Sequence, residues 1–208
     1  LAFHQEFQVG SFSIFPLYCL SKAAKDNGYK VALTGEGADE LFNGYFRNEV
    51  LINEEEYIQK YNKLGYGPLA NRYFSDQLNR ITRMYATSGI KNDFDRVYSL
   101  LEKYWQSDTN INHNLSKIEF NLFLQPLLTS ADRMSMANSV ELRNPFLDFR
   151  IINFSRKLVP SLRYKNNKGK NILRLALREL LKDEKLAIFD REVKQGLPSP
   201  INSWLFSN

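Results

Sequence analysis

Residues 11–50 constrain the fold more than any other part of the chain. Apolar residues at helical spacing predict a helix over residues 11–25, which ends at an Asn-Gly pair. The short apolar run Tyr29–Thr34 then predicts a fully buried strand, and after a glycine turn a second helix begins near Asp39. Helix, strand and helix in this order are typical of a doubly wound parallel sheet, so the predicted fold class is α/β.

The remainder of the chain is predicted to be mainly helical. Apolar residues three and four apart indicate helices over residues 97–105, 118–126 and 172–181, and Pro126 is expected to end the second of them. Strand signals nearly vanish in this part of the sequence. Because one strand cannot form a parallel sheet alone, we expect its neighbours upstream of Leu1 and interpret the 208 residues as part of a longer protein.

The composition favours a globular protein and argues against several functional classes. No window approaches the roughly 18 uncharged apolar residues of a membrane helix. The single cysteine, Cys19, excludes an internal disulfide and fits a reducing compartment such as the cytoplasm. The two histidines, His4 and His113, lack metal-ligand spacing, so a zinc site has little support.

The chain is basic, with a net charge of +5, and its densest basic stretch is residues 165–178. Three interpretations are open, in order of preference: a loop and helix with a solvated face, a rim that faces an anion, and a nucleic-acid patch. No nucleic-acid reader motif accompanies the stretch, so a nucleic-acid partner is not expected.

The first candidate site is the sequence TGEGADE, which follows the predicted strand and is called the acid loop below. Ligands of parallel sheets bind beyond the carboxyl ends of strands, and glycine lets a ligand approach the backbone closely. Glu36, between Gly35 and Gly37, can accept a proton or bind Mg²⁺ there, although a solvated turn glutamate is the alternative. Asp39 is either the N-cap of the next helix or a ligand-binding residue.

A second cluster of charges occupies residues 130–148, SADRMSMANSVELRNPFLD. Its small residues permit close helix packing, whereas charges are costly to bury unpaired. One interpretation is a buried ion-pair network that holds a helix and a turn together, with Asp132, Arg133, Glu141 and Arg143 as its members. The other is that an arginine faces a phosphate or a carboxylate, because the guanidinium fork suits both.

A third cluster, residues 189–205, places Arg191 and Lys194 just before Gly196 and a proline-bracketed helix start. A loop lysine is usually solvated. Beside a polyphosphate it instead supplies a compact positive charge where negative charge develops.

The three clusters, in this order, resemble the synthetase domain of the asparagine synthetase B family. GEGADELFNGY is similar to the family's acid loop, DRMSMANSVELRNPFLD to its signature helix and turn, and KNILRLAL with REVKQGLPSP to its C-terminal region. The resemblance runs from about Phe15 to Leu205, although residues 53–114 match only by position. It implies a pyrophosphatase-type nucleotide fold, of which residues 1–208 would be the helix-rich C-terminal portion.

The resemblance also implies a reaction. The family uses ATP and Mg²⁺ to adenylate the side-chain carboxylate of aspartate, and ammonia from a glutaminase domain then gives asparagine, AMP and pyrophosphate. By position, Glu36 and Lys194 match catalytic residues and Asp39 matches a residue associated with Mg²⁺. The candidate nucleotide-binding residues are Gly35, Gly37 and Arg191.

The sequence departs from the family pattern in two places. The phosphate loop, Ser-Gly-Gly-x-Asp-Ser, and the N-terminal glutaminase domain are absent from residues 1–208, and Cys19 does not replace that domain's terminal cysteine. We expect both upstream of Leu1, and we expect the 208 residues alone to be catalytically inactive. Relatives with the same fold act on other acids and include β-lactam formers, lasso-peptide cyclases and sugar amidotransferases, and Glu36 favours the aspartate-amidating type over the β-lactam type. A non-catalytic scaffold is the alternative from another class.

Overall fold

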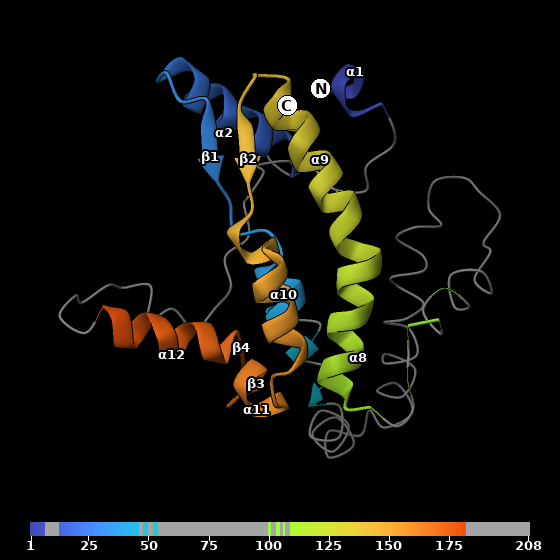
Figure 1. The fold of residues 1–208 in the computed structure, drawn as a ribbon. Helices are drawn as coiled ribbons and strands as arrows, with labels where there is room; N and C mark the ends of the chain where they lie inside the picture. Colours follow the sequence, from blue (N-terminus) through green and yellow to red (C-terminus); the bar gives the residue numbers. More distant parts are fainter. Residues whose placement is uncertain are drawn as a thin grey trace, which may run out of the picture.

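The computed structural model describes residues 1–6, 13–45, 48–49, 52–53, 100, 103–104, 106 and 109–181. Figure 1 shows the arrangement of the elements. The helices are α1 (Ala2–Gln5), α2 (Ile14–Asp26), α3 (Ala38–Phe42), α8 (Ile111–Ile118), a π-helix (Glu119–Phe123), α9 (Leu124–Met136), a 3₁₀-helix (Pro145–Leu147), α10 (Phe149–Arg156), α11 (Pro160–Arg163) and α12 (Asn171–Leu180). The strands are β1 (Val31–Leu33), β2 (Glu141–Arg143), β3 (Tyr164–Lys165) and β4 (Lys168–Gly169).

Strands β1 and β2 pair in parallel and lie side by side in Figure 1, with Val31 opposite Glu141 and Leu33 opposite Arg143. The predicted strand is therefore confirmed. The expectation that its neighbours lie only upstream of Leu1 is wrong, because β2 belongs to this chain. Residues 141–143 were expected in a helix and turn, since a three-residue strand with a charge at each end has neither length nor an apolar run to reveal it.

The prediction that Tyr29–Thr34 is fully buried is also wrong. The side chains of Val31 and Leu33 are 49% and 76% exposed, and Ala32 between them is half-buried. Successive residues of a strand point to opposite faces, so the exposed pair lies on one face and Ala32 on the other. Among the described residues, other elements pack only on the face of the sheet that carries Ala32.

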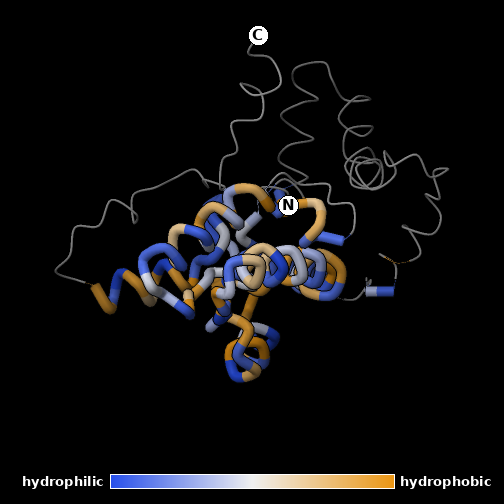
Figure 2. Tube along the Cα trace, turned by 90° about the horizontal axis from the view of Figure 1, so that it is seen from above, coloured by the Kyte–Doolittle hydropathy of each residue, from blue (hydrophilic) through white to orange (hydrophobic). Residues whose placement is uncertain are grey.

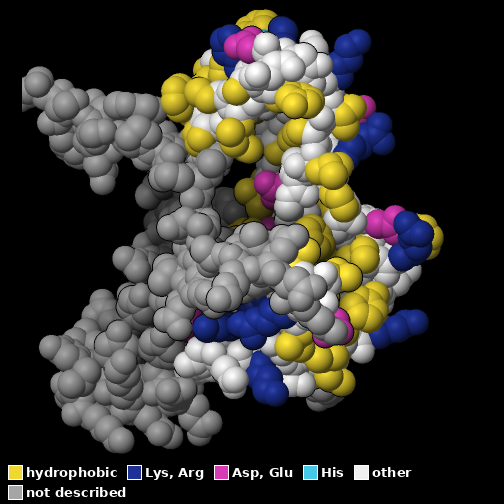
Figure 3. Space-filling model, turned by 90° about the vertical axis from the view of Figure 1, so that its left-hand side faces the viewer, with side chains coloured by type: hydrophobic (Ala, Val, Ile, Leu, Met, Phe, Trp, Pro, Cys, Tyr) yellow, Lys and Arg dark blue, Asp and Glu magenta, His cyan; other side chains and the backbone are white. Residues whose placement is uncertain are grey.

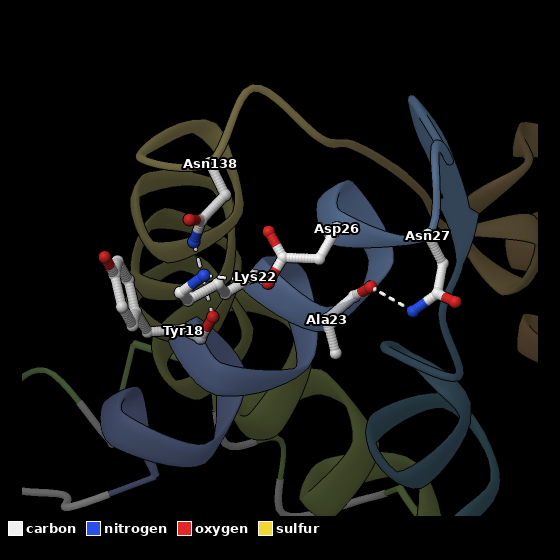
Figure 4. A network of polar contacts seen from close by, with 6 residues as sticks. All are labelled: Tyr18, Lys22, Ala23, Asp26, Asn27 and Asn138. Atoms are coloured by element: carbon white, nitrogen blue, oxygen red, sulfur yellow. Dashed lines mark hydrogen bonds and ion pairs between the residues drawn. The ribbon is translucent and has the colours of Figure 1, made fainter.

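Helix α2 confirms the predicted first helix and packs against α9. Its last turn carries an ion pair of 2.7 Å between Lys22 and Asp26, and the chain leaves it through Gly28, whose φ is 81°. Beyond α9, Asn138 donates its side-chain N–H to the backbone oxygen of Tyr18 at 3.3 Å, which ties the end of one helix to the other (Figure 4). This helix pair flanks the two parallel strands.

Helix α8, the π-helix and α9 form one continuous column in Figure 1. The prediction that Pro126 ends this helix is wrong, because Pro126 lies in the first turn of α9. Proline normally breaks a helix, since it lacks an N–H and its ring collides with the carbonyl one turn earlier. The wider π-turn directly before it changes the spacing of those carbonyls, which lets the column continue.

The core surrounds α3, the helix that follows the acid loop. Leu41, Phe42 and Leu158 are buried at its centre, and Phe42 makes an edge-to-face contact with Phe146 at 6.5 Å between ring centroids. Half-buried side chains from the 3₁₀-helix, α10, α11, α12 and the π-helix pack around them. Burying one such aromatic side chain contributes about 1.5–3 kcal/mol, so α3 anchors the acid loop to the hydrophobic core of the described residues.

The predicted C-terminal helix is confirmed as α12, which extends away from the rest of the described residues and alternates hydrophobic with hydrophilic residues (Figure 2). Its first turn packs on the core through Ile172 and Leu173, whereas Leu180 near its end is 79% exposed. Most of the predicted helix over residues 97–105 lies outside the described residues. No described helix is both long and apolar enough to cross a membrane.

Candidate functional site

The carboxyl ends of β1 and β2 meet at Thr34. Its backbone N–H donates to the oxygen of Arg143 at 2.9 Å, and its hydroxyl donates to the side-chain oxygen of Asn144 at 2.5 Å. The same hydroxyl accepts the backbone N–H of Glu36 at 3.3 Å. One threonine thus links the acid loop to the turn after β2, so the first and second sequence clusters come together at the predicted edge of the sheet.

Two glycines of the acid loop have different roles. Gly37 is the N-cap of α3 with a φ of 89°, and a Cβ at this position would lie 2.2 Å from Cδ2 of Leu147. The loop therefore packs directly on the 3₁₀-helix after β2, and the backbone conformation favours glycine. At Gly35 a Cβ would meet nothing within 4 Å. Gly35 thus leaves open space beside the loop, which is what a ligand approaching the backbone needs.

Asp39 is not an N-cap. Gly37 holds that position, so Asp39 is the second residue of α3 and lies in its first turn with Glu40. The two acids differ in their surroundings: Glu40 is buried and accepts a hydrogen bond from the hydroxyl of Tyr45, whereas the side chain of Asp39 is 19% exposed. The cap interpretation is therefore wrong, and of the two acids Asp39 is the one that keeps some exposure to solvent.

Asp39 forms an ion pair with Lys170, whose ammonium nitrogen lies 2.9 Å from Oδ1 of the carboxylate. Sequence reasoning missed this residue, because Lys170 falls in the basic stretch whose preferred interpretation was a solvated face. That interpretation holds for Lys165 and Lys168, which are exposed. The glycine before Lys170 was the only local signal of a close packing contact.

Glu36 is half-buried at the turn between β1 and α3. On the face that lies to the left in Figure 1, acidic side chains lie above a group of Lys and Arg side chains (Figure 3). A carboxylate at the end of a parallel strand, beside glycine backbone that a ligand can approach, is suited to accept a proton from a bound substrate.

The predicted buried network of the second cluster is wrong. Arg143 pairs with Glu141 at 3.0 Å, but both side chains are more than half exposed. Arg133 instead reaches Glu6 at 3.0 Å, and Asp132 is exposed. Because Glu141 and Arg143 are two residues apart on strand β2, they point to the same exposed face and remain in water rather than entering the core.

Asp148, the last residue of NPFLD, has a structural role. It caps α10 by accepting the N–H of Arg150 at 2.8 Å, and its carboxylate also binds that guanidinium at 2.8 Å. The side-chain and backbone hydrogen bonds from Arg150 lower the pKa of Asp148 to about 2. The cap fixes the turn after β2, which is the surface on which the acid loop packs.

Arg163 is a buried residue that sequence reasoning did not single out. It is 1% exposed and donates to the backbone oxygen of Leu41 and to the hydroxyl of Ser116, both at 2.8 Å, and also to the oxygen of Ser155. Burial lowers the pKa of Arg163 to about 10, which leaves the guanidinium charged at neutral pH. Its bonds join α3, α8 and α10 beneath the acid loop.

The third cluster cannot be placed beside the other two, because Arg191 and Lys194 lie outside the described residues. In the described part of the chain, no group of three or more metal-ligating side chains comes together. Asp39 is still compatible with Mg²⁺, because this ion is commonly bound by one or two carboxylates together with substrate phosphates. Among the described residues, Asp39 is thus a single carboxylate that would need phosphate or water oxygens to complete the coordination of such an ion.

The described elements define an α/β protein with a carboxylate-bearing loop at the carboxyl ends of two parallel strands. The sequence model of the family described as asparagine synthase matches residues 1–208. The chain therefore belongs to this family, which confirms the resemblance found in the sequence.

Individual relatives are more distant. The chain is 29% identical over 236 residues to asparagine synthetase [glutamine-hydrolyzing] 1 of Bacillus subtilis, covering 99% of this chain and 36% of that protein. It is 26% identical over 224 residues to a putative asparagine synthetase [glutamine-hydrolyzing] of Mycobacterium tuberculosis, covering 93% and 33%. It is 25% identical over 231 residues to the amidase chyE of Penicillium rubens, covering 87% and 34%. The chain spans about a third of the length of these relatives. No solved structure matches it.

Proposed function

We propose that this chain is part of an ATP-dependent amide-forming synthetase that makes asparagine from aspartate and ammonia. The observation that carries the proposal is the position of the acid loop at the carboxyl ends of β1 and β2. Two contacts hold it there: the hydrogen bond between Thr34 and Asn144, and the packing of Gly37 against Leu147. Family membership supports the class of reaction.

In this proposal ATP provides the activating group, and Mg²⁺ bound with it neutralises phosphate charge. The aspartate side-chain oxygen bonds to the α-phosphorus while the bond to pyrophosphate breaks. The nitrogen of ammonia then bonds to the acyl carbon, AMP leaves with the carboxylate oxygen, and Glu36 accepts a proton from the nitrogen. The open space at Gly35 gives the acyl group access to the loop.

The other predicted residues take supporting roles. Asp39 would hold the Mg²⁺ that accompanies the nucleotide, and its place in the first turn of α3, with its side chain partly exposed, is compatible with this. Lys194 would stabilise negative charge on the phosphates and on the tetrahedral intermediate, and Arg191 would bind the nucleotide. A phosphate loop, a complete doubly wound sheet of pyrophosphatase type, and ammonia from a glutaminase domain remain part of the proposal.

A second candidate is amidation of a different carboxylate. It is favoured by the relative named as an amidase, whose similarity to this chain is close to that of the mycobacterial relative. The acid loop would serve the same chemistry, because in this proposal its residues position the reacting acyl group and do not select its identity.

An isotope experiment on the full-length protein tests both candidates. Aspartate labelled with ¹⁸O in its side-chain carboxylate should transfer one label to AMP, because the adenylate forms through that oxygen. Pyrophosphate release should require aspartate, and asparagine should form when ammonia is added. Release that requires another carboxylate would favour the second candidate. Absence of ATP-dependent pyrophosphate release with any carboxylate would favour a non-catalytic scaffold.

A further inference from the structure

The ion pair between Asp39 and Lys170 joins two parts of the chain that are far apart in sequence. Lys170 follows the β3–β4 hairpin and precedes α12, whereas Asp39 lies in the first turn of α3. The ammonium nitrogen is 2.9 Å from Oδ1, and the two side chains are only 29% and 19% exposed. A pair this enclosed is screened less by water and salt than an ordinary surface ion pair.

The backbone around the pair is built to hold it. The N–H of Lys170 donates to the oxygen of Phe42, the last residue of α3, at 2.8 Å. At Gly169 a Cβ would lie 1.9 Å from the backbone oxygen of Asn43, so the hairpin packs directly on the end of α3. The hairpin therefore fixes the position from which the lysine side chain reaches Asp39.

Gly44 closes the pair from the other side. A Cβ at this position would lie 2.1 Å from Oδ1 of Asp39 and 2.3 Å from Cε of Lys170. The carboxylate oxygen and the lysine stem therefore occupy the space that any larger residue would need. Two glycines, Gly44 and Gly169, permit this close approach of side chain and backbone.

Lys170 also adopts an unfavourable backbone conformation. Its φ of 58° and ψ of 31° lie in the left-handed region, which residues other than glycine, asparagine and aspartate rarely adopt. Such a conformation persists only where surrounding contacts impose it, and it is concentrated at ligand-binding sites. A lysine that was merely solvated would need neither this conformation nor the enclosed ion pair.

We propose that Lys170 is the counter-ion of Asp39 in the nucleotide-free protein and thereby makes the divalent cation enter with the nucleotide instead of alone. The ammonium holds Oδ1 and neutralises the carboxylate, so a bare cation meets a neutral pair and gains little Coulomb energy. A cation that arrives with phosphates brings its own anionic ligands and no longer depends on Asp39 alone. The role of the nucleotide rests on the proposed function, whereas the effect on a bare cation does not.

The test is Mn²⁺ binding to the nucleotide-free, full-length protein, followed by electron paramagnetic resonance of the free ion. We expect Lys170→Gln to bind Mn²⁺ at least about tenfold more tightly than the wild type, or ~1.4 kcal/mol. Lys170→Arg, which keeps the charge, should bind Mn²⁺ as weakly as the wild type. Lys165→Gln is the matched control, because it removes the same charge from an exposed position of the same hairpin and should leave binding unchanged.

A double variant shows whether the gained affinity belongs to Asp39. Asp39→Asn combined with Lys170→Gln should lose the gain. Equal Mn²⁺ binding by Lys170→Gln and the wild type, with both folded, would overturn the inference, as would a gain that survives Asp39→Asn. Lys170→Met, which keeps the apolar stem of the side chain, replaces Lys170→Gln if the latter does not fold.

Pyrophosphate release by the wild type, measured in parallel, separates this inference from the proposed function. Release together with unchanged Mn²⁺ binding in Lys170→Gln would remove the role of Lys170 and leave the proposed function standing. A gain in Mn²⁺ binding without any pyrophosphate release would leave the counter-ion role standing and remove the proposed function.

Discussion

Replacing Gly37 by alanine should destabilise the protein, and the size of the loss follows from two separate costs. The φ of 89° at this position is unfavourable for any residue with a Cβ, which costs about 1–2 kcal/mol. The new Cβ would also lie 2.2 Å from Cδ2 of Leu147, and overpacking of this kind typically costs about 1–3 kcal/mol. Because the end of a leucine side chain can move, we take the lower half of that range and expect a total loss of about 2–4 kcal/mol.

The assay is urea unfolding of the full-length protein, with the free energy of unfolding compared between variants. Gly35→Ala is the matched control, because its Cβ would meet nothing within 4 Å, and its stability should change by less than about 0.5 kcal/mol. A double variant, Gly37→Ala with Leu147→Ala, should recover the part of the loss that comes from overpacking, while the cost of the backbone conformation remains.

Equal stability of Gly37→Ala and Gly35→Ala would refute the reasoning, because the acid loop would then neither hold the left-handed turn nor pack on the 3₁₀-helix. The same control variant carries information about the site. If the open space at Gly35 admits the acyl group, Gly35→Ala should raise KM for the carboxylate substrate although the protein remains as stable as the wild type.

Three further substitutions in the full-length protein test other residues. Glu36→Gln should reduce amide formation by roughly 10²–10⁴-fold without changing the melting temperature, and wild-type turnover would remove Glu36 from the chemistry. Lys194→Ala should lower kcat by about 10²–10³-fold. Lys194→Arg should not restore kcat, because the planar guanidinium of arginine does not replace the compact ammonium of lysine. Wild-type kcat in both variants would indicate a solvated loop lysine. Arg163→Met should lower the free energy of unfolding by about 3 kcal/mol, because buried acceptors lose a charged donor. The exposed Arg178→Met is its control, and equal melting of the two would contradict the buried role.

Local patterns were sufficient to predict the segment that carries the acid loop. The helix over residues 14–26, the strand over residues 31–33 and the glycine turn before α3 each follow from spacing or residue type within a few positions. The position of Glu36 just beyond the strand follows from the same local sequence pattern. Glu36 is therefore a candidate base on local grounds alone, whereas Asp39 could equally have been a helix cap by spacing.

Other features depend on contacts that no local pattern records. Strand β2 is three residues long and becomes a strand through its pairing with β1, which lies 110 residues earlier in the register Val31–Glu141. The exposure of Leu33 depends on which elements cover the sheet. The passage of the helix through Pro126 depends on the π-turn before it. In each case the local structure is set by a tertiary contact or by the neighbouring backbone, either of which can override the intrinsic propensity of the residues.

The ion pair between Asp39 and Lys170 shows most clearly which features the sequence determines and which depend on the tertiary structure. The sequence alone determined that a carboxylate follows a strand and that a lysine follows a glycine, because these are properties of neighbouring residues. Only the tertiary structure decided that the two side chains meet at 2.9 Å, since the β3–β4 hairpin must first pack on the end of α3. Charge pairing across 131 positions costs chain entropy that only a folded core offsets, so it leaves no trace in local periodicity.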